Sequence, residues 1–281
     1  MKFLRRKKSA MSLERLLDRC EVPAFPAVTM RILGKIRDPA LSSRELAEAL
    51  QWDPALVVQL LQMVNSAAFG VAQPIHDVAH ASTYLGRSQV EQVVLALAIK
   101  DTLPRTPAQG FEPNRFWYAA AFRATLASTI ADQIHPARRA ESFTMGLLQD
   151  LALPVLATAM PDEYGPVLVR WHSDPHVHLV DLERDAFGWC HGEVGGALGR
   201  RWDLPSTLVR GIEQHHGRDA ADPDLPPANR LVSVLREARA EHGIERLIED
   251  ARDAHGLEAD WMRAAVAEAQ QRASELAMSL A

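Results

Sequence analysis

The stretch from residue 143 to residue 153 constrains the fold of this chain more than any other. It reads Phe-Thr-Met-Gly-Leu-Leu-Gln-Asp-Leu-Ala-Leu, an apolar run without proline that carries Gln149 and Asp150 side by side. If the run is helical, as its composition predicts, most of it is too apolar to face water. Gln149 and Asp150 are then carried into or beside a core, where a polar pair needs hydrogen-bonding partners.

Two kinds of partner fit Asp150. The simpler one is a neighbouring helix end that hydrogen-bonds the carboxylate. The other is a set of three histidines, His191, His215 and His216, each embedded in an apolar helical pattern, which together with Asp150 could line one pocket. An interior histidine with a satisfied ring is the ordinary interpretation for His191 and His215, and His216 is the one we expect nearer the surface. Both interpretations stay open at this point.

Helical signals follow one another along the chain, and strand signals are nearly absent. Ser42 with Glu45, and Ser88 with Glu91, predict capping boxes, and Asp53 before Pro54 predicts a further helix start. Hydrophobic residues make up 47% and charged residues 24% of the 281 positions, as in an ordinary globular protein. The predicted fold class is therefore all-α.

The chain divides into two packed helical lobes. The first spans residues 11–103 after a basic tail at 1–10, and the second begins at 114. Residues 104–113 between them are rich in turn formers, so we expect an exposed linker. The basic tail is expected to be solvated, with weak attraction to an anionic membrane as the alternative.

Charge and cysteine content exclude several functions. The net charge of −5 and the pI near 6.1 create no overall field for nucleic acid. Two short helices at 42–51 and 53–64 suggest a helix-turn-helix, but the second lacks Lys and Arg, so direct duplex binding is not expected. Two cysteines fit a reducing cytosol, and no apolar stretch approaches the length of a membrane span. A cytoplasmic protein is expected.

Two further patterns concern helix packing. Four glycines between residues 192 and 199 share closely related helical positions and indicate close approach of another helix, because no strand precedes them as a phosphate loop requires. An apolar stripe from Trp261 to Leu276 follows one face of a helix at about 258–280. This stripe either docks on the body of the protein or recruits another copy or partner.

Motifs in a fixed order over residues 22–100 and 116–216 resemble those of one family. They include Asp53-Pro54-Ala55-Leu56, Asn65-Ser66-Ala67-Ala68-Phe69-Gly70 and Leu85-Gly86. The succession resembles HDOD domains, bacterial signalling modules related to HD-domain metal phosphohydrolases. The resemblance implies that residues 114–220 form an HD-like helical lobe. Beyond the match, residues 221–281 are expected to form a helical extension that packs on or near this lobe.

The resemblance implies a site like that of HD-domain phosphohydrolases. In those enzymes, histidines and aspartates from several helices hold divalent metal, and the metal activates a water molecule. This chain departs from that pattern. Gln149 replaces the histidine of the pair that names the superfamily, Ala119 stands where relatives often carry a histidine, and the late aspartate falls on Asn229. Asp150 and the histidines at 191, 215 and 216 persist. Because a neutral amide is a poor substitute for imidazole, metal-dependent catalysis is not expected.

These considerations predict a vestigial HD-like pocket without catalytic or cofactor-binding residues, made of Gln149, Asp150, His191, His215 and His216. We expect no metal there, with weak binding of a divalent ion as the alternative. The resemblance implies a non-catalytic bacterial signal-transduction regulator that binds signalling proteins, and cyclic dinucleotides or other nucleotides are further candidate ligands. The alternative is a residual metal-dependent phosphohydrolase acting on a nucleotide or phosphoester. The sequence leaves the oligomeric state open.

Overall fold

The computed structural model describes residues 12–19, 27–36, 38, 40–105, 108–174, 176–216, 222–235 and 243–280. Within these ranges the chain is all-α, without a β-strand, which confirms the predicted class. The predicted basic tail at residues 1–10 falls outside these ranges.

Short, capped helices build the first lobe. The Ser42 hydroxyl accepts a hydrogen bond from the Glu45 amide (3.2 Å), and Glu45 accepts one from the Ser42 amide (2.8 Å), which confirms this capping box. The second predicted box was wrong, because the helix begins at Arg87 with Gly86 as its N-cap. The elements are α2 (Ala27–Ile36), α3 (Ser43–Leu50), α4 (Pro54–Val64), the 3-10 turn η1 (Ala67–Phe69), α5 (Val78–Leu85) and α6 (Arg87–Thr102).

The second lobe is built around the long helix α7 (Pro113–Ile134), which packs on α8, α14 and α16. The other elements are η2 (Pro136–Arg138), α8 (Arg139–Leu148), α9 (Ala152–Ala159), α10 (Pro161–Ser173), α11 (Leu179–Phe187), α12 (His191–Arg201), α13 (Ser206–Gln214), α14 (Pro227–Val232), α15 (Ile244–His255) and α16 (Ala259–Leu280). Helix α1 (Leu13–Arg19), which the sequence division placed in the first lobe, lies against α12 of the second.

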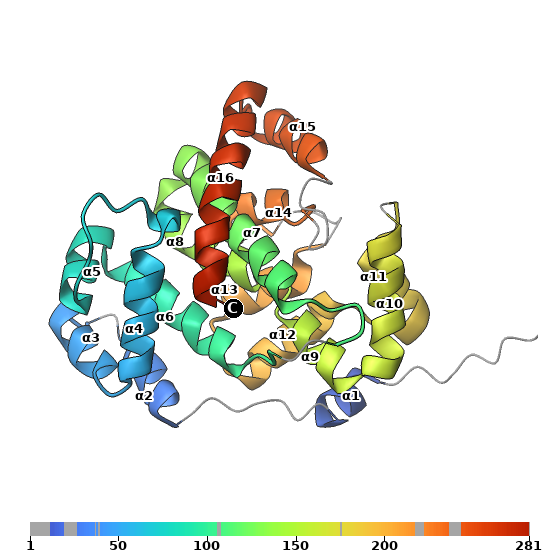
Figure 1. Cartoon of the computed structure of the whole chain (residues 1–281), viewed down its shortest axis with the longest axis horizontal. Helices are drawn as coiled ribbons and strands as arrows, with labels where there is room; N and C mark the ends of the chain where they lie inside the picture. Colours follow the sequence, from blue (N-terminus) through green and yellow to red (C-terminus); the bar gives the residue numbers. More distant parts are fainter. Residues whose placement is uncertain are drawn as a thin grey trace, which may run out of the picture.

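The two lobes share one apolar core. The ring of Phe69 in η1 packs on that of Phe143 in α8, with 5.1 Å between centroids. Helix α16 runs across the middle of the molecule between the lobes (Figure 1) and contacts α7, η1 and α4. Its Glu275 carboxylate accepts a hydrogen bond from the Ala67 amide of η1 (3.1 Å), and its apolar stripe is buried from Ala265 to Leu276. The stripe therefore docks on the body of the protein.

The segment expected as an exposed linker has exposed residues at 105, 109 and 112, but it is anchored at Gly110 and Phe111. Phe111 is buried, and a Cβ on Gly110 would lie 2.9 Å from the Leu168 Cβ of α10. The positive φ of Gly110 (75°) allows the tight turn that brings the two segments together. The connection between the lobes is thus held against α10.

One segment corrects the expectation that no apolar stretch has the length of a membrane span. Residues 136–159 form a helical stretch of 24 residues whose most apolar 18-residue window has a mean hydropathy of 1.2, which is long and apolar enough to cross a bilayer. However, 89% of the most apolar window is buried inside the protein. We therefore assign this segment to the core.

The stretch at 143–153 is not one helix, which corrects the expectation from its composition. Helix α8 ends at Leu148, residues 149–151 form a turn, and α9 begins at Ala152. Leu151 donates to the Leu148 carbonyl (3.1 Å), a tighter hydrogen bond than that of an α-helix. Gln149 and Asp150 are nevertheless carried into the interior, with 1% and 8% of their surface exposed.

Close contact between α12 and α13 confirms the interpretation of the glycines as packing residues. A Cβ on Gly192 would lie 2.9 Å from the Glu213 carbonyl oxygen, and one on Gly195 would lie 2.6 Å from the Ile212 Cγ2. Side chains at these positions would force the helices apart. The glycines therefore set the distance between His191, which begins α12, and the histidines that follow α13.

We expect Gly192→Ala to lower the free energy of unfolding by about 1–3 kcal/mol, because backbone must move to admit the methyl group. Urea unfolding provides the measurement. Gly34→Ala is the matched control, since a Cβ at Gly34 in α2 meets nothing within 4 Å. The control should be neutral or stabilising by up to about 1 kcal/mol. Equal effects of the two substitutions would contradict this account.

Candidate functional site

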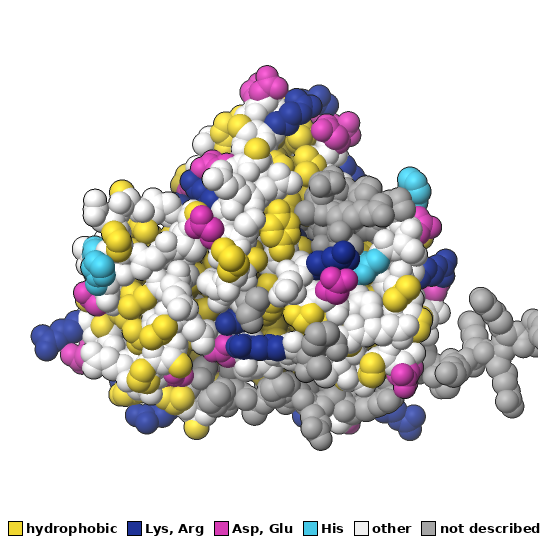
Figure 2. All heavy atoms as spheres, viewed as in Figure 1, with side chains coloured by type: hydrophobic (Ala, Val, Ile, Leu, Met, Phe, Trp, Pro, Cys, Tyr) yellow, Lys and Arg dark blue, Asp and Glu magenta, His cyan; other side chains and the backbone are white. Residues whose placement is uncertain are grey.

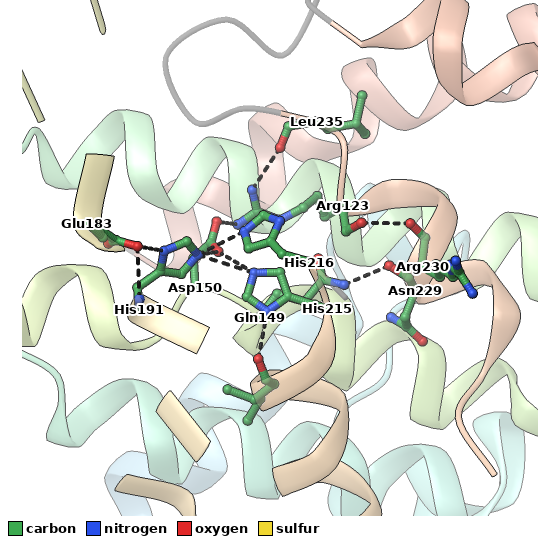
Figure 3. Close-up of polar contacts among 12 residues, drawn as sticks. Arg123, Gln149, Asp150, Glu183, His191, His215, His216, Asn229, Arg230 and Leu235 are labelled. Atoms are coloured by element: carbon green, nitrogen blue, oxygen red, sulfur yellow. Dashed lines mark hydrogen bonds and ion pairs between the residues drawn. The ribbon is translucent and has the colours of Figure 1, made fainter. Parts of the chain in front are cut away.

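Four of the five predicted pocket residues converge on one point (Figure 3). Asp150 comes from the turn between α8 and α9, His191 is the first residue of α12, and His215 and His216 directly follow α13. One ligand atom from each lies within 4.8 Å of all the others. The fifth, Gln149, turns away, and its amide nitrogen donates to the Asn229 carbonyl at 2.7 Å.

The contacts inside this cluster are short. The Asp150 Oδ1 lies 3.1 Å from His215 Nε2 and 3.3 Å from His191 Nε2. The His191 Nε2 in turn lies 2.9 Å from His216 Nε2 and 3.3 Å from His215 Nε2. Three side chains of the cluster are buried, whereas His216 is exposed, as its sequence context indicated. We call these four residues the His–Asp cluster.

Arg123, the cation that pairs with Asp150, was not predicted from the sequence. Arg123 lies in α7 with 2% of its surface exposed, and its Nη2 is 2.8 Å from Asp150 Oδ2. Its Nη1 donates to the Leu235 carbonyl at 3.2 Å. Burial alone would raise the pKa of Asp150, but the Arg123 charge and hydrogen bonds from His191 and His215 hold that pKa well below its usual range. A lone arginine within the apolar run 116–131 was the signal that could have revealed it.

Glu183 was missed as well. It lies in α11 and is completely buried. Its Oε2 accepts a hydrogen bond from the His191 amide (3.0 Å) and lies 2.7 Å from His191 Nδ1, while its Oε1 accepts one from the Tyr164 hydroxyl. Burial alone would lower the pKa of His191, but the carboxylates of Glu183 and Asp150 raise it well above its usual value. Nothing in the local sequence of α11 distinguishes Glu183 from a solvated helix acid.

The positions that depart from the phosphohydrolase pattern have structural roles. The Asn229 side-chain amide donates to the Ser142 carbonyl (2.8 Å), and Gln149 donates to the Asn229 carbonyl, so together they fasten α14 to α8. Ala119 is buried in α7 and offers only a methyl group. The remaining amide oxygens of Gln149 and Asn229 are neutral and much weaker metal ligands than carboxylate or imidazole.

The donors present therefore fit one divalent ion and not two. Asp150, His191, His215 and His216 would hold that ion, and a bound divalent ion supplies positive charge at the centre of the cluster. In a four-coordinate site with metal–nitrogen bonds of about 2.0–2.1 Å, neighbouring ligand atoms are about 3.3–3.4 Å apart. Four separations between ligand atoms of the cluster, 2.9–3.3 Å, are close to that spacing, and one ligand atom from each of the four residues lies within 4.8 Å of the others. A second ion would lack imidazole and carboxylate ligands at positions 119, 149 and 229.

A helical lobe that gathers an aspartate and histidines from separate helices into one buried cluster defines an all-α protein of HD type. The family model of the HDOD domain matches residues 22–218. The chain therefore belongs to the HDOD domain family, as its motifs predicted.

Several proteins are similar to this chain. An uncharacterized protein of Treponema pallidum is 27% identical over 232 residues, which is 81% of this chain and 43% of that protein, so the chain spans less than half of that relative. A crystal structure of a Geobacter sulfurreducens HDOD domain protein of unknown function aligns with a TM-score of 0.76 at 23% identity, over 94% of this chain and 96% of that one. A candidate signal transduction protein from Marinobacter aquaeolei aligns with a TM-score of 0.73 at 20% identity, over 98% and 63%. These likenesses establish the fold.

We expect Arg123→Met to lower the free energy of unfolding by about 3–5 kcal/mol, because the Asp150 carboxylate is left buried without its cation. Urea unfolding of the single variants and of the double variant Arg123→Met/Asp150→Asn gives the measurement. The double variant should recover part of the loss, since it removes both charges. A loss of less than about 1 kcal/mol in the free energy of unfolding of the single variant, or no recovery in the double variant, would contradict a stabilising role of the Arg123–Asp150 ion pair.

Proposed function

We propose that this protein is a non-catalytic bacterial signal-transduction regulator of the cytoplasm that acts by binding signalling proteins. Cyclic dinucleotides or other nucleotides are further candidate ligands. The proposal adds a function to the family assignment. It rests on the observation that both oxygens of the Asp150 carboxylate have partners within the protein.

Both oxygens of Asp150 are occupied within the protein. Oδ2 pairs with Arg123, and Oδ1 faces His191 and His215. Hydrolysis of a phosphoester by an HD-type site needs a metal-bound water and ligands that leave a coordination position open for it. Here three positions that could supply further ligands are Ala119, Gln149 and Asn229. We therefore infer that the buried polar contacts of Asp150 hold the second lobe in shape and do not support turnover.

The alternative, a residual phosphohydrolase, is tested by turnover. We expect no hydrolysis of bis(p-nitrophenyl) phosphate or of cyclic dinucleotides above buffer with Mn²⁺, Fe²⁺ or Mg²⁺, because Ala119, Gln149 and Asn229 supply no imidazole or carboxylate ligand. The control is Asp150→Asn purified in the same way, which separates true turnover from contamination. A wild-type rate that disappears in Asp150→Asn would overturn the non-catalytic assignment.

Exposed apolar side chains on the first lobe support a protein partner. Val58 of α4 is 54% exposed, Tyr84 of α5 51% and Met30 of α2 42%. Hydrophobic side chains are visible at the surface over this lobe in Figure 2. Helices α4 and α5 contact each other, and large exposed apolar groups on neighbouring helices are typical of protein-binding sites. We therefore place the partner-binding surface on the first lobe, around Val58 and Tyr84.

We expect Val58→Glu/Tyr84→Glu to abolish co-purification of the partners that the wild-type chain captures in its native bacterium, because buried charge in an apolar contact is costly. Quantitative mass spectrometry of matched pull-downs measures this. Val169→Glu is the control, since Val169 is 45% exposed but belongs to α10 of the second lobe. Equal loss in the control, or no loss in the double variant, would contradict the proposed surface.

A melting-temperature panel with nucleotides distinguishes a ligand sensor from a pure protein-binding module. Ligand at about 100 times its dissociation constant adds about 2.7 kcal/mol to the stability of the folded state. A rise with a cyclic dinucleotide supports nucleotide binding, and a flat response across the panel supports protein binding alone.

A further inference from the structure

Hydrogen positions in the His–Asp cluster follow from the contacts of its rings. The Nδ1 of His191 faces the Glu183 carboxylate, and the Nδ1 of His215 lies 2.6 Å from the Ile212 carbonyl oxygen. A carbonyl or carboxylate oxygen only accepts, so each Nδ1 must carry its hydrogen. In a neutral ring the Nε2 then presents a lone pair.

If both rings are neutral, these lone pairs point at one another. The Nε2 atoms of His191 and His215 are 3.3 Å apart, and each lies within 3.3 Å of Asp150 Oδ1. The Nε2 of His216 approaches that of His191 to 2.9 Å. Acceptors packed this closely repel each other unless a cation lies among them. Arg123 does not serve, because its ion pair is with the other oxygen, Oδ2.

Protons alone satisfy the arrangement poorly. A hydrogen on His191 Nε2 can make a good hydrogen bond to one acceptor only. The Nε2 of His215 and the Oδ1 of Asp150, which are 3.1 Å apart, then face each other without a hydrogen between them. A second hydrogen, on His215, would place two buried imidazolium rings with nitrogens 3.3 Å apart. A single divalent ion supplies the same two positive charges without bringing like charges together.

We propose that the His–Asp cluster is a closed, structural site for one divalent transition-metal ion, with Glu183 and Arg123 as its positioning residues. Three imidazole nitrogens and one carboxylate oxygen complete a four-coordinate shell, and structural sites in proteins are closed in this way. Glu183 fixes the ring of His191, as carboxylates bonded to ligating histidines do. Arg123 holds Oδ2, so that Asp150 offers one oxygen only.

The ion ties three parts of the second lobe together. Asp150 belongs to the turn before α9, His191 to the start of α12, and His215 and His216 to the end of α13. Binding to the folded chain alone stabilises it by mass action. The site thus acts as a cross-link, and it requires no turnover.

Metal content and spectroscopy of the full chain test this site. We expect about one ion per chain in the purified protein by elemental analysis, and a lower melting temperature after removal of the ion with dipicolinate. Co²⁺ added to the stripped chain should give the intense visible absorption of four-coordinate cobalt. A chain that holds no metal and gives no cobalt absorption would overturn the site and leave the non-catalytic function intact. Two ions per chain with turnover would overturn both proposals.

Variants separate the ligands from their support. His216→Gln removes an exposed ligand and should weaken Co²⁺ binding at least about 100-fold, whereas His255→Gln, an exposed histidine of α15, should leave it unchanged. Glu183→Gln should weaken binding about 10- to 100-fold with the cobalt absorption retained at saturation. Tyr164→Phe is the milder test of the same support, because it removes only the hydroxyl bonded to Glu183. Unchanged affinity in His216→Gln, or in both Glu183→Gln and Tyr164→Phe, would contradict the assigned roles.

Discussion

The buried carboxylate of Asp150 is the point on which the second lobe depends. It connects α7 through Arg123, α12 through His191 and α13 through His215, and it belongs to the turn that ends α8. A carboxylate with 8% of its surface exposed is tolerated only where its oxygens are met by charged or hydrogen-bonding partners. The positions of these helices are therefore set by the requirement to supply such partners, in addition to apolar packing.

The same requirement explains the turn at 149–151. A continuous helix from 143 to 153 would satisfy its own backbone, but the break at Leu148 places Gln149 and Asp150 where they serve different neighbours. Gln149 fastens α14 by way of Asn229, and Asp150 faces Arg123 and the histidines. Local apolar composition predicted the burial correctly and the helix incorrectly, because the turn is stabilised by contacts with residues far away in sequence.

Most of the fold could be predicted from periodicity and capping, since these signals are local. Each of these signals lies within one helix or next to it. They are the Ser42 capping box, the glycines of α12 and the apolar stripe of α16. Arg123 and Glu183 could not be found in this way. Arg123 is 27 residues from Asp150, and Glu183 is separated from His191 by the turn between α11 and α12, so their roles exist only after the helices pack.

The buried polar groups around Asp150 need a physical explanation, because apolar residues of similar volume often stabilise a core equally well. Apolar packing alone, however, lets helices slide along one another at little cost. The contacts of His191 with Glu183 and of His215 with Asp150 are short and directional, and they fix the register of α12 and α13 against the turn. Helix α7 contacts both the cluster and the last helix, because its Arg123 faces Asp150 and the helix also packs on α16. Through Glu275, α16 reaches η1 of the first lobe, and it also packs on α4, so a continuous series of packed helices connects the interior cluster to the first lobe.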